Sequence, residues 1–141
     1  MNLMEKIKVV VEGATGLVFH YDTARTLNNT LDKAKYPCVL SNILQSGTAI
    51  DKGGSVHERI ELELRFADKS NVDFDGLKVE QTIDGLKKLA FRTLLKFYKS
   101  DLVRVLRVGN TERYYATEDV ILCGFGLRIE LEEIEGTTLC S

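Results

Sequence analysis

The sequence predicts an α+β fold, in which an antiparallel or mixed sheet is packed on one face by a long central helix and an N-terminal helix. Three observations carry this prediction. Residues 76–100 repeat apolar side chains at steps of three and four, which is typical of an amphipathic helix. Residues 56–66 and 121–131 each place apolar side chains at every second position, as strands with two different faces do.

Length and composition indicate a single domain over residues 1–141, with a flexible tail from about residue 134. Of the 141 residues, 44% are hydrophobic and 28% are charged, an ordinary balance for a globular protein. The net charge of -2 does not favour a nucleic-acid or membrane-surface binder. No apolar run is long enough for a signal peptide or a membrane span, so we expect the protein in the cytoplasm of the cell that makes it.

The N-terminal segment, residues 3–14, has the apolar face of a helix, although its three consecutive valines also suit a strand. Gly13 and Gly16 end the segment. The sequence VVVEGATGL also matches the strand and glycine turn that open a dinucleotide-binding fold. That fold needs a small residue where Phe19 stands, so we favour a helix C-cap followed by a turn.

Two short features precede the main strands. Residues 17–21 form an apolar run that predicts a brief strand, and the polar residues 22–35 have room for one or two helical turns. Pro37 marks a boundary, because the residue before a proline is pushed toward extended geometry. We predict a strand over residues 38–50 directly after it.

That strand should pair with residues 56–66 as a hairpin. Residues 51–54, Asp-Lys-Gly-Gly, have turn chemistry, and so do Ser46 and Gly47. The second strand alternates strictly between apolar and charged side chains, which predicts one buried and one solvated face. Its apolar positions are Ile60, Leu62, Leu64 and Phe66.

The central helix is predicted to bury one apolar stripe. Asp75 is its expected N-cap, since a carboxylate there can accept from the first free backbone N–H groups. Carboxylates near the start also favour the positive end of the helix dipole. The stripe comprises Val79, Ile83, Leu86, Ala90, Leu94 and Phe97.

The last part of the chain predicts two or three further strands. Residues 102–108 form the first, Gly109 to Thr111 make a turn, and Tyr114 and Tyr115 start a return. Residues 121–131 form a long strand. Its second face carries Gly124 and Gly126, where a backbone or an aromatic ring can approach closely.

Residues for catalysis or metal binding are sparse, so we predict no enzyme, no cofactor and no metal site. The two histidines, His20 and His57, would have to converge with Cys123 or with carboxylates from unrelated segments. The three cysteines form no CxxC pair. The acidic residues around the helix start lack the spacing of a calcium loop.

A second apolar stripe on the central helix is the candidate subunit contact. It comprises Phe91, Leu95 and Tyr98, about a third of a turn away from the first stripe. Either the N-terminal segment covers it or another subunit does. A basic flank beside it fits a solvated face or a phosphate contact. The flank comprises Lys87, Lys88, Arg92, Lys96 and Lys99.

The whole-chain pattern resembles the proteins that close bacteriophage tails, the tail terminator or tail-completion family and its head–tail joining relatives. The matching features are the strand entered through Tyr36-Pro37, the charged strand HERIELELRF, the long Leu- and Lys-rich helix, and the late strand through Cys-Gly-Phe-Gly that continues as LRIEL. The resemblance spans residues 36–131 and includes no catalytic motif.

The resemblance implies a structural virion protein, commonly a ring of six subunits that caps the tail tube and meets the head connector. We expect an acidic lumen face that lets DNA pass without binding it, formed by Glu58, Glu61, Glu63, Glu130, Glu132 and Glu133. Two other functions stay open. One is a small intracellular module that binds a protein or peptide, and the other is an enzyme whose site is assembled from scattered residues.

Overall fold

The computed structural model describes residues 2–21, 35–70, 76–117, 121–134 and 137–138. The predicted N-cap Asp75 and nearly all of segment 22–35 lie outside the described residues. In the tail that we expected to be flexible, Thr137 and Thr138 form a short strand. The elements in chain order are α1 (Leu3–Thr15), β1 (Phe19–Tyr21), β2 (Cys38–Ile50), β3 (Ser55–Lys69), α3 (Gly76–Tyr98), β4 (Val103–Thr117), β5 (Ile121–Glu133) and β6 (Thr137–Thr138).

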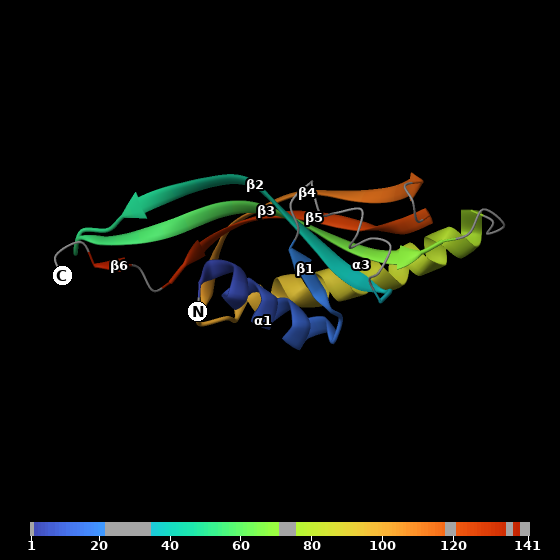
Figure 1. The fold of residues 1–141 in the computed structure, drawn as a ribbon, viewed down its shortest axis with the longest axis horizontal. Coiled ribbons are helices and arrows are strands. Elements are labelled where there is room, and N and C mark those ends of the chain that lie inside the picture. Colours follow the sequence, from blue (N-terminus) through green and yellow to red (C-terminus); the bar gives the residue numbers. More distant parts are fainter. Residues whose placement is uncertain (1, 22–34, 71–75, 118–120, 135–136, 139–141) are drawn as a thin grey trace.

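The strands form one sheet in the order β1-β2-β3-β5-β4, and β6 pairs with β3. Only β1 with β2 is parallel, and the other pairs are antiparallel. Both helices lie against the same side of this sheet (Figure 1). The predicted α+β class, a mixed sheet with a long central helix and an N-terminal helix on one face, is therefore confirmed.

α1 shows why the N-terminal segment is a helix. The Asn2 side chain accepts from the Glu5 backbone N–H at 2.9 Å, and the Glu5 carboxylate accepts from the Asn2 N–H at 3.5 Å. This reciprocal capping box satisfies two free donors. Gly16 ends the helix with φ 70°, a left-handed conformation that favours glycine. The helix with a glycine C-cap is confirmed, and the strand that a dinucleotide-binding fold would need is absent from this segment.

β2 and β3 form the predicted hairpin, but β2 passes straight through Ser46 and Gly47, so the turn predicted there was wrong. Both residues pair with β3, and the chain reverses direction only after them, at residues 51–54. Asp51 closes the turn, because its carboxylate accepts from the backbone N–H groups of Gly53 and Ser55. Gly54 has φ 84°.

β4 also differs from the prediction. Gly109 to Thr111 do not reverse the chain, and Tyr114 and Tyr115 continue the same strand instead of starting a return. The pairing with β5 slips between Val108 and Thr111, which is the mark of a β-bulge. Glycine fits this bulge closely, because a Cβ at Gly109 would lie 3.1 Å from the Arg128 Cβ.

The core lies between the helices and the sheet. The predicted stripe of α3 and the apolar positions of β3 and β5 pack in one cluster. Thr93 of α3 is also fully buried, with its hydroxyl donating to the Leu89 carbonyl. A smaller cluster lies on the opposite, outer face of the sheet, around Cys38, Leu40, Ala67 and Leu122.

Part of the hairpin lies beyond this core. We call residues 46–58, which include the turn, the arm. β5 pairs with β3 only from Arg59 to Lys69. In the arm, β3 pairs with β2 along one edge and, among the described residues, with β6 along the other. In Figure 1 the arm extends past both helices.

Candidate functional site

The second apolar stripe of α3 is exposed. The exposed fractions are 46% for Phe91, 60% for Leu95 and 62% for Tyr98. Phe91 makes one edge-to-face contact with Phe125, with ring centroids 5.8 Å apart. α1 packs on α3 but leaves this stripe uncovered. The sequence left open whether the N-terminal segment or another subunit covers this stripe. The structure shows that residues 2–21 do not cover it.

A row of cations follows the stripe around the helix. Arg92, Lys96 and Lys99 each stand one position after Phe91, Leu95 and Tyr98, so the two rows run side by side. These three cations are exposed and form no ion pair with another described residue. Two other predicted members of the basic flank are engaged within the helix, since Lys87 and Lys88 both pair with Asp84. The free part of this surface is therefore apolar and positively charged.

The six glutamates predicted to share a lumen face are divided between the two faces of the sheet. Strand register and alternation place four of them, Glu61, Glu63, Glu130 and Glu132, on the outer face away from the helices. Glu58 and Glu133 fall on the helix side. The Glu133 carboxylate accordingly lies 3.9 Å from Lys6 of α1. The prediction of one shared face was wrong for these last two residues.

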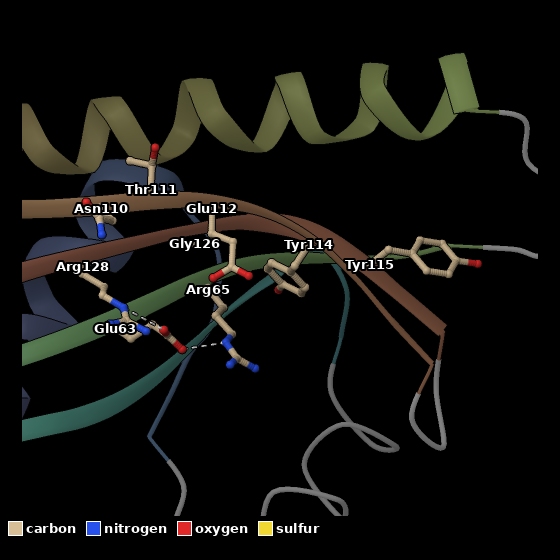
Figure 2. A pocket seen from close by; sticks show the side chains of 9 residues that line it. All are labelled: Glu63, Arg65, Asn110, Thr111, Glu112, Tyr114, Tyr115, Gly126 and Arg128. Carbon is tan, nitrogen blue, oxygen red and sulfur yellow. Dashed lines mark hydrogen bonds and ion pairs between the residues drawn. The ribbon is translucent and has the colours of Figure 1, made fainter.

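The outer face is also not acidic in net terms. Each of its four glutamates lies within 4.0 Å of an arginine on β3, β4 or β5. The tightest group is Glu63, which is buried between Arg65 at 2.7 Å and Arg128 at 3.4 Å (Figure 2). Cross-strand pairs of opposite charge stabilise a sheet locally and cancel its field. This face is a mosaic of both signs.

A shallow hollow of about 450 Å³ opens in this mosaic. Figure 2 shows Glu63, Arg65, Arg128 and Tyr114 around it, on strands β3, β4 and β5. The Arg65 guanidinium lies 5.6 Å from the centre of the Tyr114 ring, a cation–π contact. The hollow carries two carboxylates, from Glu63 and Glu112, and two guanidiniums, so it has no net charge with which to select an ion.

Tyr114 covers Gly124, as the sequence predicted for an aromatic ring over this glycine. A Cβ on Gly124 would lie 2.6 Å from the Tyr114 hydroxyl and would also meet the Phe66 carbonyl oxygen. Burial raises the pKa of the Tyr114 hydroxyl above its ordinary value, although the Arg65 charge opposes the shift. Among the described residues this hydroxyl has no hydrogen-bond partner. Its role is packing.

His57 ties the arm to the end of β5. Its Nε2 lies 3.0 Å from the Asp51 carboxylate and its Nδ1 lies 3.0 Å from the Glu133 carbonyl oxygen. Both neighbours are acceptors, so both ring nitrogens can donate only when the imidazole is protonated. The hydrogen bond with Asp51 is the main cause that raises the pKa of His57 and lowers that of Asp51.

The remaining candidate residues do not converge. His57 and Asp68, the partner of Cys123, are eleven residues apart on β3, which corresponds to about 36 Å. His20 is on β1 and pairs with Leu40 of β2. β3 separates these two strands from β5, which carries Cys123. Burial raises the pKa of Cys38 to about 12 and also raises that of Cys123, so both thiols stay protonated. Within the described ranges, no group of three His, Cys, Asp or Glu side chains could hold a metal ion.

Two features of the arm and the outer face were not anticipated from sequence. The Asp51–His57 pair spans the predicted turn, and its signal was the spacing of six residues across a tight hairpin. Most of the arginines that neutralise the glutamates share the outward positions of β3 and β5 with them, as Arg59, Arg65 and Arg128 do. Reading both signs of charge on one face would have found the mosaic.

Comparisons of the sequence with protein-family models and with curated proteins gave no match. No helix in the described part of the chain is both long and apolar enough to cross a membrane.

Proposed function

We propose that this chain is a structural subunit that assembles with copies of itself, and that it serves as a ring-forming phage or prophage virion protein at the head–tail junction. The observation that carries the proposal is the exposed stripe of Phe91, Leu95 and Tyr98. Three large apolar side chains, aligned on one helix and bordered by cations, are typical of a surface that a protein partner covers.

The margins of the sheet support the same proposal. Among the described residues, β4 pairs with β5 alone over its whole length, and β2 pairs only with β3 beyond Ser41. Unpaired strand edges can continue a sheet into a neighbour. The two edges lie at opposite margins of one sheet, so joining them would be a head-to-tail contact, which closes into a ring when the rotation allows.

The charge mosaic modifies what such a ring would present to DNA. If the outer face lined the lumen, paired glutamates and arginines would give it little net attraction or repulsion for phosphate. DNA would pass such a surface without being held. The tail tube and the head connector remain the proposed partners of the assembled ring, and the chain itself is proposed to have no catalytic role.

The experiment is to measure assembly of the wild type and of Leu95→Asp by sedimentation velocity and negative-stain electron microscopy over a concentration series. We expect closed rings from the wild type and monomers from the variant, because a carboxylate in a desolvated apolar contact is strongly unfavourable. Leu95 is exposed, so the variant should keep the thermal midpoint of the wild type.

Leu77→Asp is the matched control. Leu77 is on the same helix and is 71% exposed, but it is eighteen residues from Leu95, about 27 Å along the helix. This control should assemble like the wild type. Monomeric wild-type protein at every concentration, or equal loss of assembly in both variants, would contradict the proposal. The neighbouring genes give an independent test, since a virion protein of this kind should lie beside genes for portal, capsid or tail tube.

A further inference from the structure

The helix side of the arm carries a trough. Ser46, Thr48, Val56 and Glu58 point to this side, as strand register and alternation require. Together with Gly47 and Glu133 they line a hollow of about 350 Å³. Most of these side chains are small, so the floor of the hollow lies close to the backbone.

No described helix covers this trough in the chain itself. α3 contacts β3, β4 and β5, whereas α1 packs mainly on α3 and β1 and reaches the rim of the trough through Lys6, 3.9 Å from Glu133. In Figure 1 the end of the β2–β3 hairpin extends past both helices, with β6 beside it. A helix from elsewhere would therefore extend the helical layer of the fold under the arm.

The trough and the exposed face of α3 are complementary in charge. Glu58 is exposed, and its carboxylate has no ion pair with a described residue. The Glu133 carboxylate lies 3.9 Å from Lys6 and accepts from the Glu58 backbone N–H at 3.1 Å. The opposite surface offers Arg92, Lys96 and Lys99, which form no ion pair within the described ranges. Complementary charge at the rim of a contact favours the correct partner and rejects surfaces of like sign.

The two surfaces are also complementary in size. The stripe projects the large side chains of Phe91, Leu95 and Tyr98, and the trough is lined by serine, glycine, threonine and valine. Bulky anchors that enter a hollow lose more water contact than the same anchors on a flat surface. Packing two α3 faces against each other would instead bring two basic rows together, which like-charge repulsion opposes.

We propose that the exposed stripe of α3 in one copy of this chain lies in the arm trough of the next copy, with its basic row against Glu58 and Glu133. The inference rests on the proposed self-assembly and specifies which surfaces meet. The contact joins two different surfaces, so it is head-to-tail, and every copy in a closed ring uses both its stripe and its trough.

A charge exchange tests this pairing. Arg92→Glu with Lys96→Glu should weaken assembly at least tenfold at low salt, since it places like charges around the trough. Adding Glu58→Lys to that variant should recover about fivefold, the scale of one exposed ion pair. The control adds Glu112→Lys in place of Glu58→Lys, since Glu112 is an exposed glutamate on the outer face without an ion pair to a described residue. This control should recover nothing. The readout is the sedimentation midpoint concentration.

The outcomes separate the two proposals. Recovery with Glu58→Lys but not with Glu112→Lys supports the pairing of stripe and trough. If the wild type assembles but neither lysine restores assembly, or both do, the pairing is wrong while self-assembly stands. If the wild type does not assemble at any concentration, self-assembly fails and the pairing fails with it.

Discussion

The body of the sheet and the arm are parts of the same two strands, yet they are held in different ways. In the body, β3 contributes Ile60, Leu62, Leu64 and Phe66 to a core that the helices cover. In the arm no described helix packs on the same strand, and Ile50 at the tip of β2 is 66% exposed. The position of the arm depends on polar contacts of Asp51, His57 and Glu133.

This difference indicates that the core stabilises the fold, whereas the arm provides surfaces for contact with a neighbour. Apolar burial supplies most of the free energy of folding, and it is concentrated between the sheet and α3. The arm adds little buried apolar area, but it offers backbone edges and a polar trough that a neighbour can use. Substitutions in the two regions should therefore have effects of different size and on different measurements.

The largest effect should come from the core. Phe97 of α3 is fully buried, so Phe97→Ala should lower the free energy of unfolding by about 3–5 kcal/mol through lost burial and the cavity that remains. Ile50→Ala in the arm should change it by less than about 0.5 kcal/mol. Urea denaturation followed by circular dichroism measures both. Similar losses in the two variants would contradict the division between body and arm.

A smaller but still clear effect is expected at Gly124. Its Cβ would overlap the Tyr114 ring and the Phe66 carbonyl, so Gly124→Ala should destabilise by about 1–3 kcal/mol or more as the strands shift. Gly126→Ala, two residues along the same face, is the matched control, because its nearest neighbour atom would be 3.7 Å from the Cβ. The difference in thermal midpoint between the two alanine variants tests how closely the tyrosine covers β5. A Gly124→Ala variant as stable as the control would show that the ring has room to move.

The smallest effect should be the pH dependence of the arm tip. The pKa of His57 is raised by its bond to Asp51, so its contribution is complete below its ordinary value near 6.5 and is lost as the pH rises through the folded pKa. The pKa of Asp51 is lowered, so its contribution is present above about 3.9 and is lost as the pH falls through the folded pKa.

The amides of Gly53 and Ser55 report this directly, since both donate to Asp51. Their protection from hydrogen exchange, corrected for the intrinsic rate, should fall by about two- to fivefold between pH 6 and pH 9. His57→Gln should remove that dependence, and amides of the body strands should show none. A pKa of His57 at or below 6.5 by NMR titration would contradict the double hydrogen bond.

Helices and strands that bury apolar side chains at a clear period could be predicted from the sequence. Features that depend on strand pairing or on charges from other strands could not. The α3 stripe and the alternation in β3 specify their partners because burial selects one face. The bulge at Gly109 has the same residue types as a turn, and the pairing with β5 on both sides of it distinguishes the two. Ser46 and Gly47 lie in β2 for a related reason, since pairing with β3 outweighs their local turn preference.

The candidate surfaces were partly foreseen. The stripe of Phe91, Leu95 and Tyr98 could be predicted from helical spacing. Its exposure could not, because it depends on where α1 packs. The glutamates were grouped by charge alone. Their division between two faces depends on register, and their neutralisation depends on arginines of β3, β4 and β5.

The most direct test of the central claim, that copies of this chain join through the stripe and the trough, is a disulfide between two copies. Leu95→Cys in one preparation and Thr48→Cys in another, both with Cys140→Ser, are mixed under mild oxidation, while Cys38 and Cys123 stay buried. The account predicts a covalent dimer that joins one chain of each kind, and none when Leu77→Cys replaces Leu95→Cys. Equal cross-linking from positions 77 and 95, or dimers only between two Leu95→Cys chains, would contradict it.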